Sequence, residues 1–250
     1  MKKMFRTPRY LLPMLLSMTG IGLLSLGVWL LMQNTPLAAS NYPVQGFDVS
    51  HHQGQIDWKQ ISPQHYQFIY IKATEGGDYQ DPNFQENWLH AREQGLNVGA
   101  YHFYRLCRDA TVQAQNFIHT VPKKWNALAP VIDLEYDSQC LLTSNRTELI
   151  QQIKLMQRLL QQHYGKAPIF YVSKTFYHVV LMGNFNKTAL WIRDYDEANP
   201  TLKDQRGWFF WQYSKQGKIA GIEQAVDLDV YAGTPAQWQS YLRYIGIQHK

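Results

Sequence analysis

Cysteine is scarce in this chain, with two residues among 250. Two thiols cannot supply a four-cysteine zinc site, an iron–sulfur cluster or the disulfide framework of a mini-protein. Charged residues are also few, at 17%, whereas hydrophobic residues make up 45% of the chain. This composition excludes a disordered or collagen-like chain and allows one large domain with a sizeable core.

The net charge of +5 is concentrated at the amino terminus. Residues 1–40 contain Lys2, Lys3, Arg6 and Arg9 and no acidic residue, and the remainder holds 20 basic and 19 acidic residues. A nearly neutral domain has no field of one sign to attract a polyanion. We therefore expect no nucleic-acid partner.

An uncharged apolar run from Leu11 to Met32 follows these basic residues. It is long enough to span a bilayer, and the preceding positive charges predict a cytoplasmic amino terminus. The alternative is a cleaved signal peptide, but the run exceeds the usual apolar region and no clean Ala-x-Ala site follows. We predict that residues 1–40 are a membrane anchor with a short linker, and that residues 41–250 form one exported domain. If the leader is cleaved, the domain is secreted.

Export changes the interpretation of Cys107 and Cys140, because unpaired thiols are unusual in an oxidising compartment. Both lie a few residues beyond the ends of predicted consecutive strands, where neighbouring strand ends can bring them within bridging distance. We predict a disulfide between them. The alternative is two unpaired cysteines.

Eight short apolar runs are typical of strands, and several are apolar on both faces, as in a parallel sheet with covered faces. The runs are Val44–Val49, Phe68–Lys72, Asn97–Phe103, Ala129–Leu134, Ala167–Val172, Ala189–Arg193, Trp208–Gln212 and Val226–Val230.

Helical patterns alternate with the first five runs. Capping residues and apolar periodicity predict helices from Asp81-Pro82 to about Gln94, from Asp109 to Thr120, from Arg146 to Tyr164, and after Thr234-Pro235. The gaps after the fifth, sixth and seventh runs are short for a parallel crossover that contains a helix. We predict an α/β fold, an irregular TIM-like barrel of about eight strands with helices missing in the C-terminal half. We expect it to be monomeric.

The predicted strand ends carry carboxylates, as the active-site end of such a barrel does. Asp133 and Glu135 are two residues apart on one strand, so they share a side, and their apolar neighbours suit the helix layer. We expect both to face the barrel mouth, where repulsion from Asp133 raises the pKa of Glu135. A protonated carboxyl group can act as a general acid on a glycosidic oxygen. The alternative is a pair that caps loops or binds a cation.

Several motifs in the same order resemble glycoside hydrolase family 25, the N,O-diacetylmuramidases or Chalaropsis-type lysozymes. They are Gly46–Gly54 with Ile56–Trp58, Phe68–Gly76, Gly99–Tyr104, Val131–Glu135, Phe210–Tyr213 and Val226–Asp229. The likeness covers about Val44 to Gly233. It implies a lysozyme that cleaves the β-1,4 bond between N-acetylmuramic acid and N-acetylglucosamine in peptidoglycan strands, on an irregular α/β barrel and with no cofactor.

The resemblance also implies roles for individual residues. Glu135 would be the general acid, and Asp133 would orient the substrate's acetamido group, whose oxygen attacks the anomeric carbon. Asp48 and Asp227 would support the acidic cluster. Four aromatic residues are candidate sugar platforms, with ordinary barrel packing as the alternative. They are Tyr104, Tyr171, Trp191 and Trp211.

Two positions depart from the family pattern, Arg193 and Cys107, which lies just after the third motif and belongs to the predicted disulfide. Arg193 stands where a small residue is more usual, and we expect it to narrow a sugar subsite, to pair with Asp194, or to be an ordinary surface residue. A metal site at Asp48, Asp227 and Asp229 is disfavoured because no histidine is spaced to complete it. A serine hydrolase is disfavoured because the chain has no Gly-x-Ser-x-Gly elbow. The remaining alternative to a muramidase is a barrel that binds wall glycan without cleaving it.

Overall fold

The structure is a computed structural model that describes residues 39–137, 140 and 145–247. The predicted membrane anchor, Leu11–Met32, lies outside these residues. Among the residues that are described, no helix is both long and apolar enough to cross a membrane.

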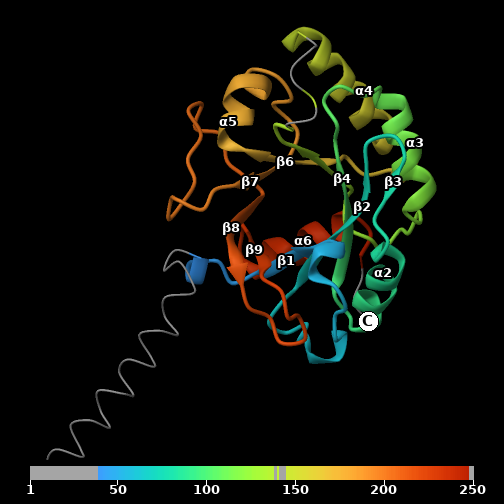
Figure 1. The fold of residues 1–250 in the computed structure, drawn as a ribbon. Helices are drawn as coiled ribbons and strands as arrows, with labels where there is room; N and C mark the ends of the chain where they lie inside the picture. Colours follow the sequence, from blue (N-terminus) through green and yellow to red (C-terminus); the bar gives the residue numbers. More distant parts are fainter. Residues whose placement is uncertain (1–38, 138–139, 141–144, 248–250) are drawn as a thin grey trace, which may run out of the picture. The chain divides into compact units, whose positions relative to one another are not determined.

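Eight strands close into a barrel, which confirms the predicted fold class (Figure 1). Around the ring they are β1 (Gln45–Val49), β2 (Phe68–Glu75), β4 (Asn97–Phe103), β5 (Val131–Leu134), β6 (Ile169–Ser173), β7 (Leu190–Arg193), β8 (Phe210–Gly217) and β9 (Val226–Tyr231). The pairing of β1 with β2 closes the ring, and the two-residue strand β3 (Tyr79–Gln80) extends the sheet beyond β2.

Strand β9 runs against the other seven. All pairs from β1 around to β8 are parallel, whereas β9 is antiparallel to both β8 and β1. The beginning of β9 therefore lies at the barrel end where the other strands finish. This end is called the mouth below, and the opposite end the base.

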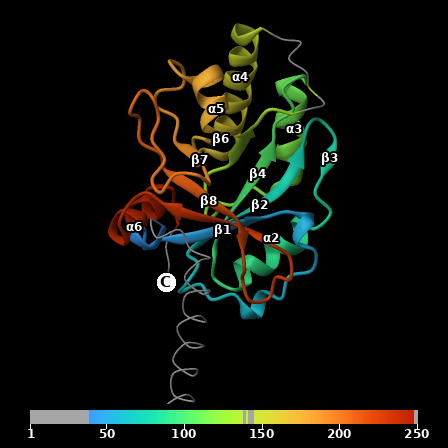
Figure 2. The ribbon, with the colours of Figure 1, turned by 60° about the vertical axis from the view of Figure 1, so that its left-hand side comes forward.

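Three long helices cover the first half of the barrel. They are α2 (Phe84–Glu93), α3 (Ala110–Thr120) and α4 (Arg146–Tyr164), and α3 and α4 lie side by side (Figure 2). The side chain of Asp109 accepts hydrogen bonds from two amides of the first turn of α3, and Gly165 ends α4 in the left-handed conformation. Helix α2 begins later than predicted, because Asp81 accepts from the amides of Asn83 and His51 and thus stabilises the preceding turn.

The second half has few helices, as predicted. After β6 the chain forms only α5 (Lys174–Phe176), which continues into the π-helical turn η4 (Tyr177–Leu181). No described helix lies between β7 and β8 or between β8 and β9. The antiparallel connection of β8 to β9 needs no crossover helix. Single 3₁₀ turns are η1 (Ala39–Asn41), η2 (His51–Gln53) and η3 (Trp58–Gln60).

The last helix, α6 (Pro235–Tyr244), closes the base of the barrel. A capping box formed by Thr234 and Gln237 begins it. The buried Trp238 packs inside the barrel, with its ring centroid 5.5 Å from that of Phe68 and 6.1 Å from that of Phe210. Trp238 and the rings around it thus fill the barrel interior from below.

Candidate functional site

A cavity of about 190 Å³ lies at the mouth, within the carboxyl ends of the parallel strands. Its walls contain all four carboxylates that the sequence places there. The lining residues are Asp48, Tyr101, Phe103, Val131, Asp133, Glu135, Tyr171, Trp191, Gln212 and Asp227.

The alternation of β5 directs two carboxylates into this cavity. Ile132 and Leu134 are fully buried in the core between strands and helices, and Asp133 and Glu135 point the other way. Successive side chains of a strand face opposite sides, so an apolar outer layer forces the acidic pair inward. The predicted orientation of the pair is confirmed.

Strands β1, β8 and β9 supply the opposite wall. Asp48 of β1 is the register partner of Asp227 of β9. The amide nitrogen Nε2 of Gln212 donates to Asp48 at 2.7 Å, and its Oε1 accepts from the hydroxyls of Tyr171 at 2.8 Å and Tyr195 at 2.6 Å. Because a glutamine amide donates on one side and accepts on the other, Gln212 holds the aromatic wall against the acidic wall.

Asp229 lies beneath Asp48 and is fully buried. One of its oxygens accepts from the indole nitrogen of Trp191 at 2.9 Å. Burial raises the pKa of both Asp48 and Asp229 well above the ordinary value, and the charge of Asp227 raises both further. This wall of the cavity therefore disfavours the charged form of both carboxyl groups.

Burial also raises the pKa of Glu135, and the nearby Arg193 opposes this effect. The predicted rise in the pKa of Glu135 is confirmed, but its largest cause is burial rather than repulsion from Asp133. The more buried Asp133 has its pKa raised well above the ordinary value, first by burial and then by the charge of Glu135. Burial therefore disfavours the charged form of Asp133 more than that of Glu135. Glu135 lies nearer the rim and combines a raised pKa with access to the cavity.

Arg193, at the end of β7, extends to the acidic pair. Its guanidinium lies 3.1 Å from Glu135, and its side chain is 37% exposed. The predicted pairing with Asp194 is wrong, because Asp194 is bound instead by Lys174 at 3.1 Å. Arg193 shares a side with Trp191, two residues earlier, and this side faces the cavity.

Two of the four predicted sugar platforms line the cavity, and two do not. Tyr171 and Trp191 form its aromatic wall, and their contact with sugar stays a prediction. Tyr104 and Trp211 are fully buried in the outer core, so neither can stack on a sugar in this cavity. Trp211 neighbours the inward-facing Gln212 and therefore faces outward, where its indole donates to the carbonyl of Asp194.

Sequence reasoning missed four lining residues, Tyr101, Phe103, Val131 and Gln212. Alternation could have found them. Tyr101 and Phe103 are two residues apart on β4, and Phe103 is the register partner of Asp133. Gln212 lies two residues after the inward-facing Phe210 on β8, so it faces the same side.

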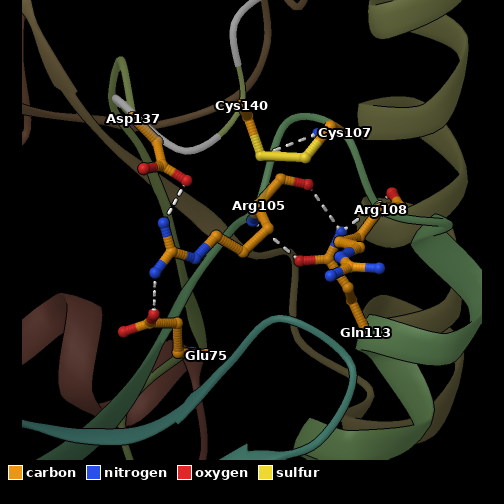
Figure 3. The surroundings of a disulfide bond; sticks show 7 residues. All are labelled: Glu75, Arg105, Cys107, Arg108, Gln113, Asp137 and Cys140. Atoms are coloured by element: carbon orange, nitrogen blue, oxygen red, sulfur yellow. Dashed lines mark hydrogen bonds and ion pairs between the residues drawn. A yellow bond between two sulfur atoms is a disulfide. The ribbon is translucent and has the colours of Figure 1, made fainter.

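A disulfide and an ionic network support the segment that follows Glu135 (Figure 3). Cys107 and Cys140 are joined by a disulfide, the pairing that the sequence predicts, with their Cα atoms 5.2 Å apart. Arg105 bridges Asp137 and Glu75. Since Asp137 is two residues from Glu135, these links tie the end of β5 to the loops that follow β2 and β4.

The arrangement can deliver a proton and orient a polar group beside it. Glu135 is the more accessible carboxyl group of the pair and has a raised pKa, and Asp133 lies next to it with one buried oxygen that has no hydrogen-bond partner. Within residues 39–137, 140 and 145–247, no three or more histidine, cysteine, aspartate or glutamate side chains are grouped so as to hold a metal ion.

Comparison with known proteins gives a consistent result. The family model described as glycosyl hydrolases family 25 matches residues 47–222. The uncharacterized protein YegX of Escherichia coli K12 is 35% identical over 208 residues, covering 81% of this chain and 75% of its own. Lysozyme M1 of Streptomyces globisporus is 29% identical over 206 residues, covering 78% and 69%.

Solved structures agree with this match. A family 25 glycosyl hydrolase from Bacillus anthracis superposes with a TM-score of 0.76 at 36% identity, covering 80% of this chain and 94% of its own. A bacterial lysozyme from Streptomyces coelicolor gives a TM-score of 0.73 at 28% identity, covering 81% and 98%.

Proposed function

Because this chain belongs to the glycosyl hydrolases of family 25, we propose that it is a muramidase that hydrolyses the β-1,4 bond between N-acetylmuramic acid and N-acetylglucosamine in peptidoglycan. The observation that carries the proposal is the pair on β5. Glu135 has a raised pKa at the cavity wall, and Asp133 faces the same side two residues earlier. A protonated carboxyl group with an adjacent orienting group is what cleavage of a glycosidic bond requires.

In the proposed reaction, Glu135 transfers its proton to the glycosidic oxygen as the bond to the anomeric carbon breaks. The acetamido oxygen of the same sugar forms a new bond to that carbon, and Asp133 orients the acetamido N–H. Water then attacks the anomeric carbon, the bond to the acetamido oxygen breaks, and the carboxylate of Glu135 takes the proton from the water. Two displacements at one carbon give net retention.

The other carboxyl groups serve this step indirectly. Asp48 accepts a hydrogen bond from Gln212 and Asp229 accepts one from Trp191, so these contacts stiffen the wall opposite Glu135. Asp227 lies at the rim and is placed to contact the sugar. Arg193 lowers the pKa of Glu135 relative to burial alone. It also stabilises the carboxylate that forms once the proton has been transferred.

The test is Glu135→Gln, which retains the size of the side chain but cannot deliver a proton. Loss of a general acid costs about 10²–10⁴-fold in rate. We expect this loss in the release of reducing ends from purified peptidoglycan, with unchanged pelleting on the same material. Glu86→Gln, an exposed position on α2, is the matched control and should retain full activity.

The same experiment separates the muramidase from a barrel that only binds wall glycan. The glycan-binding alternative predicts pelleting without released reducing ends in the wild type, and no difference between Glu135→Gln and the control. Mass spectrometry of the products identifies the sugar at the new reducing end. Release of N-acetylglucosamine at that end would contradict the proposed bond specificity.

We also propose that the domain acts on the exported side of a membrane, held by the predicted anchor Leu11–Met32. The Cys107–Cys140 disulfide supports this location, because disulfides persist in oxidising compartments. Protease added to intact spheroplasts should digest the domain of the full chain. Protection until the membrane is lysed would contradict an exported location.

A further inference from the structure

One part of the base of the barrel carries charge of one sign. It is built from the segments that precede β5, β6 and β7, residues 121–130, 165–168 and 182–189, and from residues 231–247 after β9. These four segments contain no aspartate or glutamate. Together they hold five basic residues, which are Lys123, Lys124, Lys166, Lys187 and Arg243. We call this surface the basal face.

The two most exposed large hydrophobic side chains of the described residues also belong to the basal face. Tyr244 is 88% exposed and Trp125 is 66% exposed. Both adjoin one region, since a single hollow is lined by Tyr244, Lys166 and Lys187, and the ammonium of Lys166 donates to the carbonyl of Trp125 at 2.7 Å. Neither ring fills a core, and large exposed apolar side chains gathered in one region mark interaction surfaces.

The near-neutral balance of the domain conceals this asymmetry. The basal face holds basic residues without a carboxylate, whereas the cavity at the mouth is lined by the carboxylates of Asp48, Asp133, Glu135 and Asp227.

We propose that the basal face docks on the surface of an anionic phospholipid bilayer. Tryptophan and tyrosine favour the headgroup level of a bilayer, where the ring is partly buried and its polar atom stays hydrated. Clustered lysine and arginine side chains are attracted to anionic lipids. Trp125 and Tyr244 supply the first element, and Lys123, Lys124, Lys187 and Arg243 supply the second.

The path of the chain is consistent with docking on a bilayer. The described chain starts at Ala39 and enters the amino end of β1, where the ring of Tyr42 lies 5.3 Å from that of Trp208, just before β8. The predicted anchor ends at Met32, seven residues before Ala39, and seven residues extend to about 25 Å at most. An anchored chain thus keeps this end of the barrel near the bilayer. Docking through the basal face would direct the cavity away from the membrane.

The experiment uses the full chain reconstituted in two kinds of vesicle, phosphatidylcholine alone and an equal mixture with phosphatidylglycerol. Hydrogen exchange is followed in peptides covering residues 121–127 and 240–247. We expect slower exchange in both peptides on the anionic vesicles only, with the protection lost at high salt because screening weakens surface attraction.

Charge reversal identifies the residues responsible. Each lysine near an anionic surface contributes roughly fivefold to the preference for the docked state, so Lys123→Glu, Lys124→Glu and Lys187→Glu together should reduce it by more than about a hundredfold. The control variant reverses the charge of three exposed basic residues that follow strands at the mouth, Lys59, Arg108 and Lys218. It changes the net charge equally and should leave the protection intact.

Equal exchange on both vesicles, or protection lost in the control variant as much as in the basal one, would overturn the proposal. Protection by soluble polyphosphate together with none on anionic vesicles would also overturn it and assign the face to a soluble polyanion. Peptidoglycan hydrolysis is not part of the readout, so the docking and the proposed function fail independently.

Discussion

Asp227 offers a measure of what the acidic cavity costs in stability. Burial, with a further contribution from the charge of Glu135, raises the pKa of Asp227 from the ordinary 3.8 to about 6. The folded protein therefore binds this proton more tightly than the unfolded chain does. The resulting stabilisation is complete below 3.8 and is lost as the pH rises to about 6.

The size of the effect follows from these two values. Each unit of difference corresponds to about 1.4 kcal/mol, so a rise from 3.8 to about 6 removes about 3 kcal/mol from the free energy of unfolding at neutral pH. Asp227→Asn retains the shape of the side chain and has no proton to lose. We expect the variant to be about 3 kcal/mol more stable than the wild type near neutral pH and equally stable below the ordinary pKa of aspartate.

Equilibrium unfolding in urea with the disulfide intact measures this difference, and an unchanged m-value shows that the unfolded state is the same. Asp78→Asn removes an exposed carboxylate and should alter the free energy of unfolding by less than about 0.5 kcal/mol. The reasoning is refuted if the advantage of Asp227→Asn over the wild type does not grow between mildly acidic and neutral pH, or if the variant is less stable at neutral pH.

Three further predictions concern the cavity and its support. Arg193→Gln removes the cation 3.1 Å from Glu135, so the pKa of Glu135 should rise. The descending limb of the plot of kcat/KM against pH should therefore move to higher pH. A limb that does not move would show that the ion pair does not affect the pKa of the general acid. The unreduced protein, unfolded in denaturant, should show no free thiol by alkylation and mass spectrometry. Replacing Cys107 and Cys140 by serine should lower the free energy of unfolding by about 3 to 4 kcal/mol for a sequence separation of 33 residues, and an unchanged value would argue against a constraint on the unfolded chain. The first product anomer seen by NMR should be β; an initial α-anomer would instead indicate a water-activating base, Asp48 or Asp227.

Local signals in the sequence were sufficient for much of the fold. Asp109 and Gly165 carry the side-chain chemistry and backbone freedom that begin α3 and end α4, so those ends are predicted to the residue. The inward orientation of Asp133 and Glu135 follows from two apolar neighbours on the same strand. Such features depend on residues within a few positions of one another, which is the range over which sequence patterns act.

Features that depend on the packing of distant segments were not predictable in this way. The partner of Arg193 comes from β5, across the cavity mouth, rather than from its neighbour Asp194. The chemistry of Trp211 suits a sugar platform, but its side of β8 faces the outer core. The basal face is assembled from four segments, so a single total of charges cannot show it.

The reversed direction of β9 has a consequence for the order in which the protein becomes functional. This strand completes the barrel between β8 and β1, places Asp227 and Asp229 at the mouth, and returns the chain to the base, where α6 closes the floor. A polypeptide is made from its amino end, so segments made after the seven parallel strands supply part of the acidic wall, the seam of the barrel and the helix that fills its base. A nascent chain that ends before β9 therefore has β5 and the two carboxylates at its end but no enclosed cavity around them. Assembly of the acidic cavity is deferred until β9 and α6 have been made.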